Sequence, residues 1–124
     1  MTNSNVRYDL LQALSEHLRT VAPDLFDLSY WRCGTTACAV GHAVDVPLIA
    51  AQGFTLLKVG YYVNLRPTLG CLKDWEAVQA LFGLTFQDCS YLFSHSEYPH
   101  EDMTTATEVA DRIDNFILTS KVTL

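Results

Sequence analysis

The segment that most constrains this chain is residues 33–43, which read Cys-Gly-Thr-Thr-Ala-Cys-Ala-Val-Gly-His-Ala. Gly34 and the two threonines after it predict a turn that leads into a helix, because a threonine hydroxyl can accept from the first unpaired amides of a helix. We therefore expect a helix to begin near Thr36. On that helix Ala37 and Gly41 lie one turn apart and carry almost no side chain, so another element can approach closely. The segment predicts a central helix with Gly41 at a close helix contact.

The same segment contains candidate metal ligands. Cys38 and His42 are four residues apart and are therefore neighbours on one stripe of the helix. A zinc hypothesis combines these two side chains with Cys33. A fourth ligand would come from one of the remaining cysteines and histidines: Cys71, Cys89, His95 or His100. Structural zinc usually takes its ligands in two tight pairs, and here only the first pair, Cys-x4-Cys, is present. The interpretation we favour is that each thiol is buried separately, with no bound metal and no cofactor.

A second hypothesis for these residues is a cysteine-dependent hydrolase. Cys33 or Cys38 would be the nucleophile, because the amides and dipole at a helix N-terminus lower the pKa of a thiol, and His42 would be the base. A base one turn along the same helix, however, lies beside the thiol and leaves little room for a substrate carbonyl. No Gly-x-Ser-x-Gly motif and no phosphate-binding glycine loop supports an enzyme. We favour a protein without catalysis, in which Cys38 is buried and unreactive and His42 is a buried imidazole bonded to a backbone carbonyl.

The length and charge of the chain exclude several classes of protein. With 124 residues, of which 49% are hydrophobic, the chain is long enough for one core, and we expect residues 1–124 to form a single helical domain. The chain is acidic, with a net charge of −6 and only eight scattered Lys and Arg residues, which argues against a surface that neutralises phosphates. A helix-turn-helix over residues 74–94 would have no Arg or Lys on its recognition helix. We expect no direct binding of nucleic acid.

The sequence shows no sign of export or membrane insertion. Residues 1–5 carry neither a basic region nor an apolar run, so no secretory signal is visible. No stretch reaches the ~18 consecutive apolar residues that span a bilayer. We expect a soluble cytoplasmic protein that does not bind membranes, in which the four cysteines are free thiols.

Apolar residues that recur every three or four positions predict the other helices, so the expected fold class is mainly α, with five to six helices. Caps and chain breakers give the expected limits of these helices: Asn3 or Ser4 to about Thr20, Pro47 to Gln52 after a cap at Asp45, Asp74 to a stop at Gly83, Thr85 to about Phe93, and Thr105 onward. Thr85 with Asp88, and Thr105 with Glu108, have the spacing of a capping box. On the helix after Thr85 the inward face is assigned to its apolar residues: Phe86, Cys89, Leu92 and Phe93.

One stretch predicts strands. Residues 54–59 and 61–65 are rich in β-branched and aromatic residues and flank a glycine, which predicts a small two-stranded β-ribbon over residues 54–65. A ribbon of two strands is marginal in water, so we expect it to pack on the helices. Pro67 and Gly70 are expected to break the chain after it.

Four segments of the chain form a recognisable combination. They are Phe26-Asp27-Leu28-Ser29-x-Trp31, the core Cys33-Gly34-Thr35-x-x-Cys38-x-x-Gly41-His42-Ala43, Gly83-Leu84-Thr85, and Leu92-Phe93. Together they resemble a family of small uncharacterised proteins of bacteria and their phages, over most of the chain, with the core as the specific motif. That family has no established activity. The resemblance therefore implies a recurring fold and carries over no catalytic residue, cofactor or substrate.

The function class that remains is a protein-binding or regulatory module that acts by protein-protein contact. The loop over residues 94–103 supports this class, because its tip is polar, acidic and partly aromatic. The candidate binding residues are those at the tip: Glu97, Tyr98, Pro99, His100, Glu101 and Asp102. An ordinary solvated loop is the other interpretation.

Within this loop we expect Tyr98 to be an exposed contact that Pro99 holds stiffly, and the acidic residues to attract a partner with a basic surface. If the chain is phage-borne, as the resemblance implies, the partner would be a host complex and the module its inhibitor. The sequence leaves the oligomeric state open.

Overall fold

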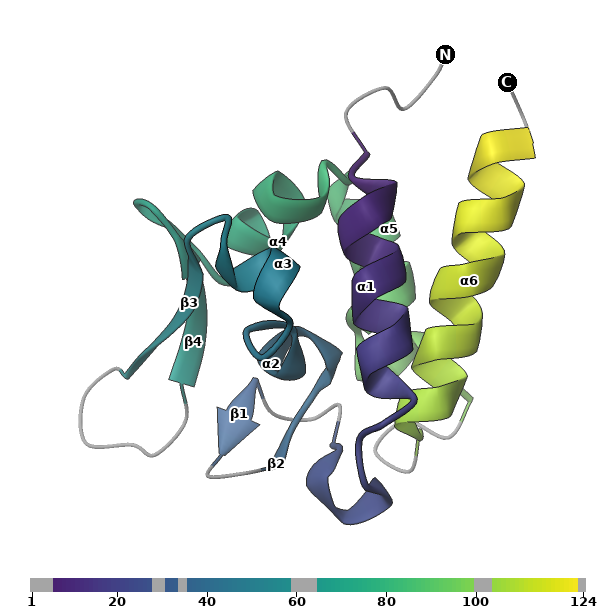
Figure 1. The fold of residues 1–124 in the computed structure, drawn as a ribbon, viewed down its shortest axis with the longest axis horizontal. Helices are drawn as coiled ribbons and strands as arrows, with labels where there is room; N and C mark the ends of the chain where they lie inside the picture. The colour runs from purple at the N-terminus through teal and green to yellow at the C-terminus, as the bar shows by residue number, and fades with distance from the viewer. Residues whose placement is uncertain (1–5, 28–30, 34–35, 59–64, 100–103, 123–124) are drawn as a thin grey trace.

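The computed structural model describes residues 6–27, 31–33, 36–58, 65–99 and 104–122. Within these residues there are six α-helices, two short 3-10 helices and five strands, so the fold is mainly α, as predicted (Figure 1). The elements in chain order are α1 (Tyr8–Leu18), the 3-10 helix η1 (Pro23–Leu25), β1 (Arg32–Cys33), β2 (Thr36–Ala37), α2 (Ala39–Ala43), α3 (Pro47–Ala50), β3 (Phe54–Lys58), β4 (Leu65–Leu69), β5 (Leu72–Lys73), α4 (Asp74–Phe82), α5 (Phe86–Phe93), the 3-10 helix η2 (His95–Glu97) and α6 (Ala106–Val122).

The elements are arranged in layers along the long axis of the molecule. α1 and α6 lie side by side at one end, β3 and β4 lie at the other end, and α2, α3 and α4 lie between them (Figure 1). α1 and α6 are antiparallel, because α1 runs away from the end of the molecule where N lies and α6 runs back toward C at the same end (Figure 1). α1 also contacts α2, α3 and α4, so the middle layer packs on it.

α1 is held at its N-terminus by the backbone and not by a capping side chain. Its N-cap is Arg7, which makes no side-chain cap, so the prediction that Asn3 or Ser4 caps this helix is wrong. The Arg7 N–H donates instead to Phe82 O at 2.8 Å, which joins the start of α1 to the end of α4. The leucine spacing did predict the buried face, which consists of Leu10, Leu11, Leu14 and Leu18.

Local signals predicted the ends of the C-terminal helices. Gly83 ends α4 in the left-handed region, with φ 68°. At the start of α5, Thr85 Oγ1 accepts from the Asp88 N–H at 3.1 Å. Thr105 and Glu108 form a complete capping box at the start of α6. The Glu108 N–H donates to Thr105 Oγ1 at 3.2 Å, and the Thr105 N–H donates to Glu108 Oε1 at 3.1 Å.

Two of the expected aspartate caps are wrong. The N-cap of α4 is Lys73, and Asp74 is the first helical residue, with φ 55°. The Asp74 carboxylate accepts two bonds from the Arg66 guanidinium, so an ion pair with β4 engages the group that was expected to cap the helix. The N-cap of α3 is Val46, without a side-chain bond, and Asp45 does not cap that helix.

The expected two-stranded ribbon is a three-stranded antiparallel sheet in the order β3-β4-β5. Residues 61–64 of the predicted second strand lie outside the described residues, and the partner of β3 is β4. Pro67 does not break the chain as predicted, since it lies inside β4 opposite Leu56. β5 pairs with β4 only from Thr68 onward, so Pro67 has a strand on one side only, where a residue without an N–H is tolerated. Gly70 turns the chain into β5 with φ 61°.

The central helix starts later than predicted. Ala37 lies in β2, where it pairs with Arg32 of β1, and its carbonyl accepts from the Asp27 N–H at 3.0 Å. These neighbours on both sides hold Ala37 in a strand, so α2 begins only at Ala39, with Cys38 as an N-cap whose side chain does not bond to the amides of the helix. All five residues of α2 are buried, so the expected central position is confirmed.

Gly41 marks a close contact, although against Trp31 and the β2 residue Ala37 and not against a helix. A Cβ on Gly41 would lie 1.6 Å from Trp31 O and 2.7 Å from the Cβ of Ala37. No side chain fits there unless the backbone moves. The backbone of Trp31 therefore lies directly against α2.

Nearly all of the buried apolar residues belong to one core cluster that extends along the chain from Val6 to Ile113. α2 lies inside this core, which places its histidine and cysteine away from bulk solvent. Over the ranges that the structure describes, no helix combines the length and the apolar character that crossing a membrane requires.

Candidate functional site

Two of the described cysteines, Cys38 and Cys89, are buried and poorly suited to act as thiolates. Cys38 is 3% exposed, as predicted, and its Sγ lies 3.8 Å from Trp31 O. Burial raises the pKa of Cys38 to about 11 and the pKa of Cys89 to about 12, so both thiols are neutral near pH 7 and poorly nucleophilic. Cys71 is exposed in the turn between β4 and β5. The side chain of Cys33 lies outside the described residues.

His42 is a buried imidazole, as predicted. It is 5% exposed, and its ring stacks on Phe26 with the centroids 6.2 Å apart. Its Nε2 lies 2.7 Å from Leu25 O. Because a carbonyl oxygen can only accept, Nε2 carries the hydrogen and the neutral ring has its lone pair on Nδ1. The backbone of η1 therefore sets both the tautomer and the orientation of this ring.

Two other possible metal ligands lie beside His42. His17 is in the last turn of α1, and Asp45 follows α2. One ligand atom from each of the three residues lies within 4.8 Å of the other two, and we call this group the His–Asp cluster. The Nδ1 of His42 lies 4.0 Å from Asp45 Oδ2. His17 is half-buried and Asp45 is exposed, so the cluster lies at the edge of the core.

The His–Asp cluster differs from the ligand set that the sequence suggested. Within the described ranges, neither Cys38 nor any other cysteine belongs to a group of three closely spaced ligands. His42 is the member that both sets share. Sequence reasoning missed His17 because it lies on another helix, and it treated Asp45 only as a helix cap. The signal that was present is the His42–Asp45 spacing of one helical turn.

The predicted binding loop has a different character from the one expected, because Tyr98 is 4% exposed and belongs to the core. Its hydroxyl donates to Leu92 O at 2.5 Å, and the Arg112 guanidinium lies 3.7 Å from the centroid of its ring. Burial raises the pKa of Tyr98 above its ordinary value. The prediction that Tyr98 is an exposed contact is therefore wrong. Its ring fills the space between α5 and α6.

The other candidate binding residues divide into two groups. Glu97 and Pro99 are exposed, as is His95 in the 3-10 helix η2. The rest lie outside the described residues: His100, Glu101 and Asp102. The described part of the loop therefore offers a partner a short polar edge without an aromatic anchor.

Three aromatic rings from separate segments form a row that reaches the surface. Trp31 packs edge-on against Trp75 with the centroids 4.9 Å apart, and Trp75 packs edge-on against Phe86 at 6.2 Å. We call these residues the aromatic row. Both tryptophans are half-buried, whereas Phe86 is 55% exposed. The prediction that Phe86 faces the core is wrong, because this residue opens α5 and its ring meets Trp75 at the protein surface.

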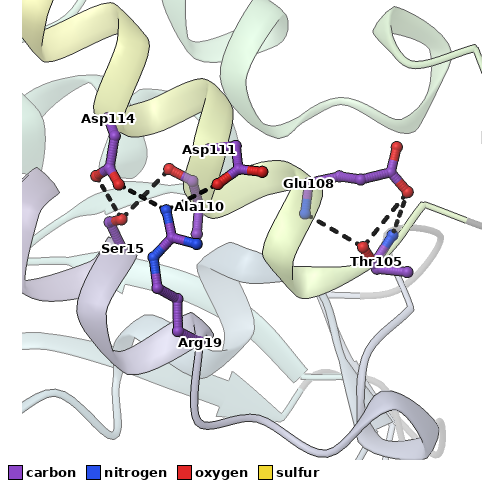
Figure 2. A network of polar contacts seen from close by, with 7 residues as sticks. All are labelled: Ser15, Arg19, Thr105, Glu108, Ala110, Asp111 and Asp114. Carbon is purple, nitrogen blue, oxygen red and sulfur yellow. Dashed lines mark hydrogen bonds and ion pairs between the residues drawn. The ribbon is translucent and has the colours of Figure 1, made fainter.

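A polar network joins α1 to α6 (Figure 2). Ser15 is fully buried, and its Oγ donates to Asp114 Oδ1 at 2.6 Å and lies 3.3 Å from Ala110 O. The Arg19 guanidinium pairs with Asp111 at 2.9 Å and with Asp114 at 2.6 Å. A shallow cleft lies beside this network. The polar side chains of this network are bonded to one another, and these bonds join α1 to α6.

Comparison of the chain with protein-family models, with curated proteins and with solved structures finds no match in any of the three. The family resemblance that the core motif indicates therefore stays a prediction. The function has to be inferred from the arrangement of the residues.

Proposed function

We propose that this protein acts by protein-protein contact and that the aromatic row is its binding surface. The observation that carries this proposal is the 55% exposure of Phe86 at the end of a row whose other members are packed in place. A single exposed apolar residue is ordinary on a protein surface, but contiguous aromatic residues are typical of binding sites. Large aromatic side chains also dominate the binding energy of many protein interfaces.

The aromatic row is organised before a partner arrives. The carbonyl of Trp31 is pressed against Gly41 and lies within reach of the Cys38 thiol, so this residue is anchored to α2. Trp75 and Phe86 are in the first turns of α4 and α5. Because the three rings pack on one another from separate segments, binding would order few additional torsion angles and lose little entropy.

The charges beside the row favour a partner with a basic rim around an apolar patch. The first turn of α4 carries the exposed Glu76 next to Trp75, and the first turn of α5 carries Asp88. The whole chain has a net charge of −6. Opposite charge around an apolar centre speeds association and excludes acidic competitors. If the family resemblance holds, the partner belongs to a bacterial host complex, whose activity the bound protein would inhibit.

Affinity capture followed by binding measurements tests this proposal. The tagged protein, Phe86→Ala and Leu118→Ala are used as baits in a bacterial lysate, and each recovered partner is purified and titrated. Leu118 is the matched control, because it is 64% exposed and lies on α6, away from the aromatic row. We expect Phe86→Ala to weaken binding by about tenfold or more at an unchanged melting temperature, while Leu118→Ala binds as the parent does.

The opposite pattern contradicts the proposal. A purified partner that binds Phe86→Ala as tightly as the parent uses another surface. In that case Phe86→Glu, which places a charge in the centre of the row, would also leave the affinity unchanged.

A further inference from the structure

We propose that His17, His42 and Asp45 form a binding site for a divalent transition-metal ion of the zinc type. The site joins α1 to α2 and to the residue Asp45 after α2, and it shares no residue with the aromatic row. It revises the expectation from the sequence that the protein holds no metal, and it replaces the cysteine-based ligand set.

The types of ligand define the kind of ion. Two imidazoles and one carboxylate provide two nitrogen donors and one oxygen donor, and one atom of each lies within 4.8 Å of the others. Imidazole nitrogen suits zinc, cobalt, nickel and copper, whereas calcium and magnesium prefer sites made of oxygen alone. Three protein ligands also leave a coordination position for water. The cluster therefore favours zinc over the alkaline-earth ions.

The hydrogen bond of His42 supplies a second and independent argument. Histidines that bind a metal usually donate their other ring N–H to a backbone carbonyl or a carboxylate, which fixes the tautomer and aims the lone pair. His42 has this arrangement, because its Nε2 lies 2.7 Å from Leu25 O while its Nδ1 faces Asp45 Oδ2 at 4.0 Å. The stacking of the ring on Phe26 fixes its plane as well. The buried member of the cluster is thus already oriented as a ligand.

The other two members can adjust to the ion. The ligand atoms of a tetrahedral zinc ion lie about 3.3 Å apart, given bonds of about 2.0 Å, so the cluster must contract when the ion binds. Asp45 has an exposed side chain and His17 a half-buried one, so rotation of these side chains can bring them toward the fixed His42. The exposed side of the cluster also gives an ion a path from solvent.

Titration of the chelator-treated protein with metal ions tests the site. We expect one zinc ion per chain with a micromolar or lower dissociation constant, and no competition from magnesium or calcium. Cobalt reports the type of ligand. A site of nitrogen and oxygen donors shows weak visible bands only, whereas bound thiolate adds intense charge-transfer bands in the near ultraviolet. Zinc at a hundredfold excess over its dissociation constant should raise the melting temperature by roughly 5–10 °C.

Matched variants identify the ligands. Asp45→Asn and His17→Ala should each weaken zinc binding by at least about tenfold, while the melting temperature measured in chelator stays that of the parent. His95→Ala is the control for an exposed histidine elsewhere, and Cys33→Ser is the control for the cysteine-based set. Both should bind zinc as the parent does. If His17→Ala is unstable, Asp45→Asn alone still tests the site, because Asp45 is on the surface.

Several results would overturn the assignment. The parent protein binding less than one ion per chain at micromolar zinc would show that the cluster is only a packing feature. Thiolate bands from bound cobalt, or loss of binding in Cys33→Ser, would assign the ion to the cysteines. Unchanged binding in both Asp45→Asn and His17→Ala would place the ion elsewhere.

Discussion

At the scale of a single residue, Arg112 connects α6 to α5 and to the 3-10 helix η2. Its Nη1 donates to Tyr91 O at 2.8 Å and to Glu97 O at 2.9 Å, and its guanidinium covers the ring of Tyr98. A cation over an aromatic face and two bonds to backbone carbonyls hold the 3-10 helix η2 against α6. This arrangement explains why an aromatic residue in a polar loop is buried.

Gly41 leads to a prediction about packing at one backbone position. Gly41→Ala should lower the free energy of unfolding by about 3 kcal/mol or more, because its Cβ would lie 1.6 Å from the backbone carbonyl oxygen of Trp31 and the backbone would have to shift. Urea denaturation followed by circular dichroism measures this loss. Gly53→Ala is the control, since φ there is 87° but no atom lies within 4 Å of the new Cβ. Backbone strain alone should cost the control about 1–2 kcal/mol. Equal losses in the two variants would mean that Trp31 yields easily to the new methyl group.

The residues that the sequence placed correctly are those whose environment depends on their own element. The burial of Cys38 and His42 and the close approach at Gly41 follow from the small residues of α2. The burial of Tyr98 does not follow from any local pattern, since it depends on Arg112 in the next helix. His17, the second histidine of the His–Asp cluster, is likewise brought to His42 only by the packing of α1 on α2.

At the scale of elements, the α1–α6 pair combines a buried polar contact with an exposed one. Ser15 bonds to Asp114 inside the interface, whereas the pairs of Arg19 lie at its rim (Figure 2). Exposed ion pairs contribute little, because solvent screens them. The bond from the fully buried Ser15 hydroxyl contributes more, because a hydrogen bond to a charged carboxylate that is partly shielded from water is stronger than a solvent-exposed ion pair.

This difference gives a prediction for the helix pair. Ser15→Ala should lower the free energy of unfolding by about 1–1.5 kcal/mol, and Arg19→Gln by no more than about 1 kcal/mol. Chemical denaturation of both variants measures the two losses. A double-mutant cycle between Ser15→Ala and Asp114→Ala then isolates the contact itself. A coupling energy of zero in that cycle would mean that the hydroxyl stabilises α1 without the help of Asp114.

Elements were predictable where their limits are set by neighbouring residues in the chain. The capping box of Thr105 and Glu108 and the left-handed Gly83 are local signals, and the helices they bound were expected. β1 and β2 were missed because Ala37 is held by partners on both sides. β4 was missed because Pro67 suggested a break in the chain. A proline fits in this strand because β5 pairs with β4 only from Thr68 onward, which the local sequence does not reveal.

At the scale of the whole molecule, the excess of acidic residues affects how fast a charged partner would approach. Fourteen acidic residues face eight basic ones, and several basic side chains are already paired with carboxylates. The field outside the protein is therefore negative over distances of about a Debye length, roughly 10 Å at moderate salt. A basic partner would feel this field before the aromatic row makes contact.

Salt should therefore change the association rate more than the dissociation rate. We expect the association rate constant for the captured partner to fall several-fold between low and high salt, with the dissociation rate nearly constant. Stopped-flow or surface binding measurements separate the two rates. Glu76→Gln should reduce the salt dependence more than Glu16→Gln, because only Glu76 lies beside the row. An association rate that does not respond to salt would exclude a basic partner surface.

The pairing of the first and last helices also governs when the chain can fold during synthesis. Ser15 bonds to groups that lie 95 and 99 residues further along the chain, so α1 leaves the ribosome long before α6 exists. Until then the leucine face of α1 lacks its main partner, and the core cannot close around α2. Contacts between such distant positions form slowly, because the loop must lose its entropy first. Native packing of α1 therefore requires that α6 has already been synthesised.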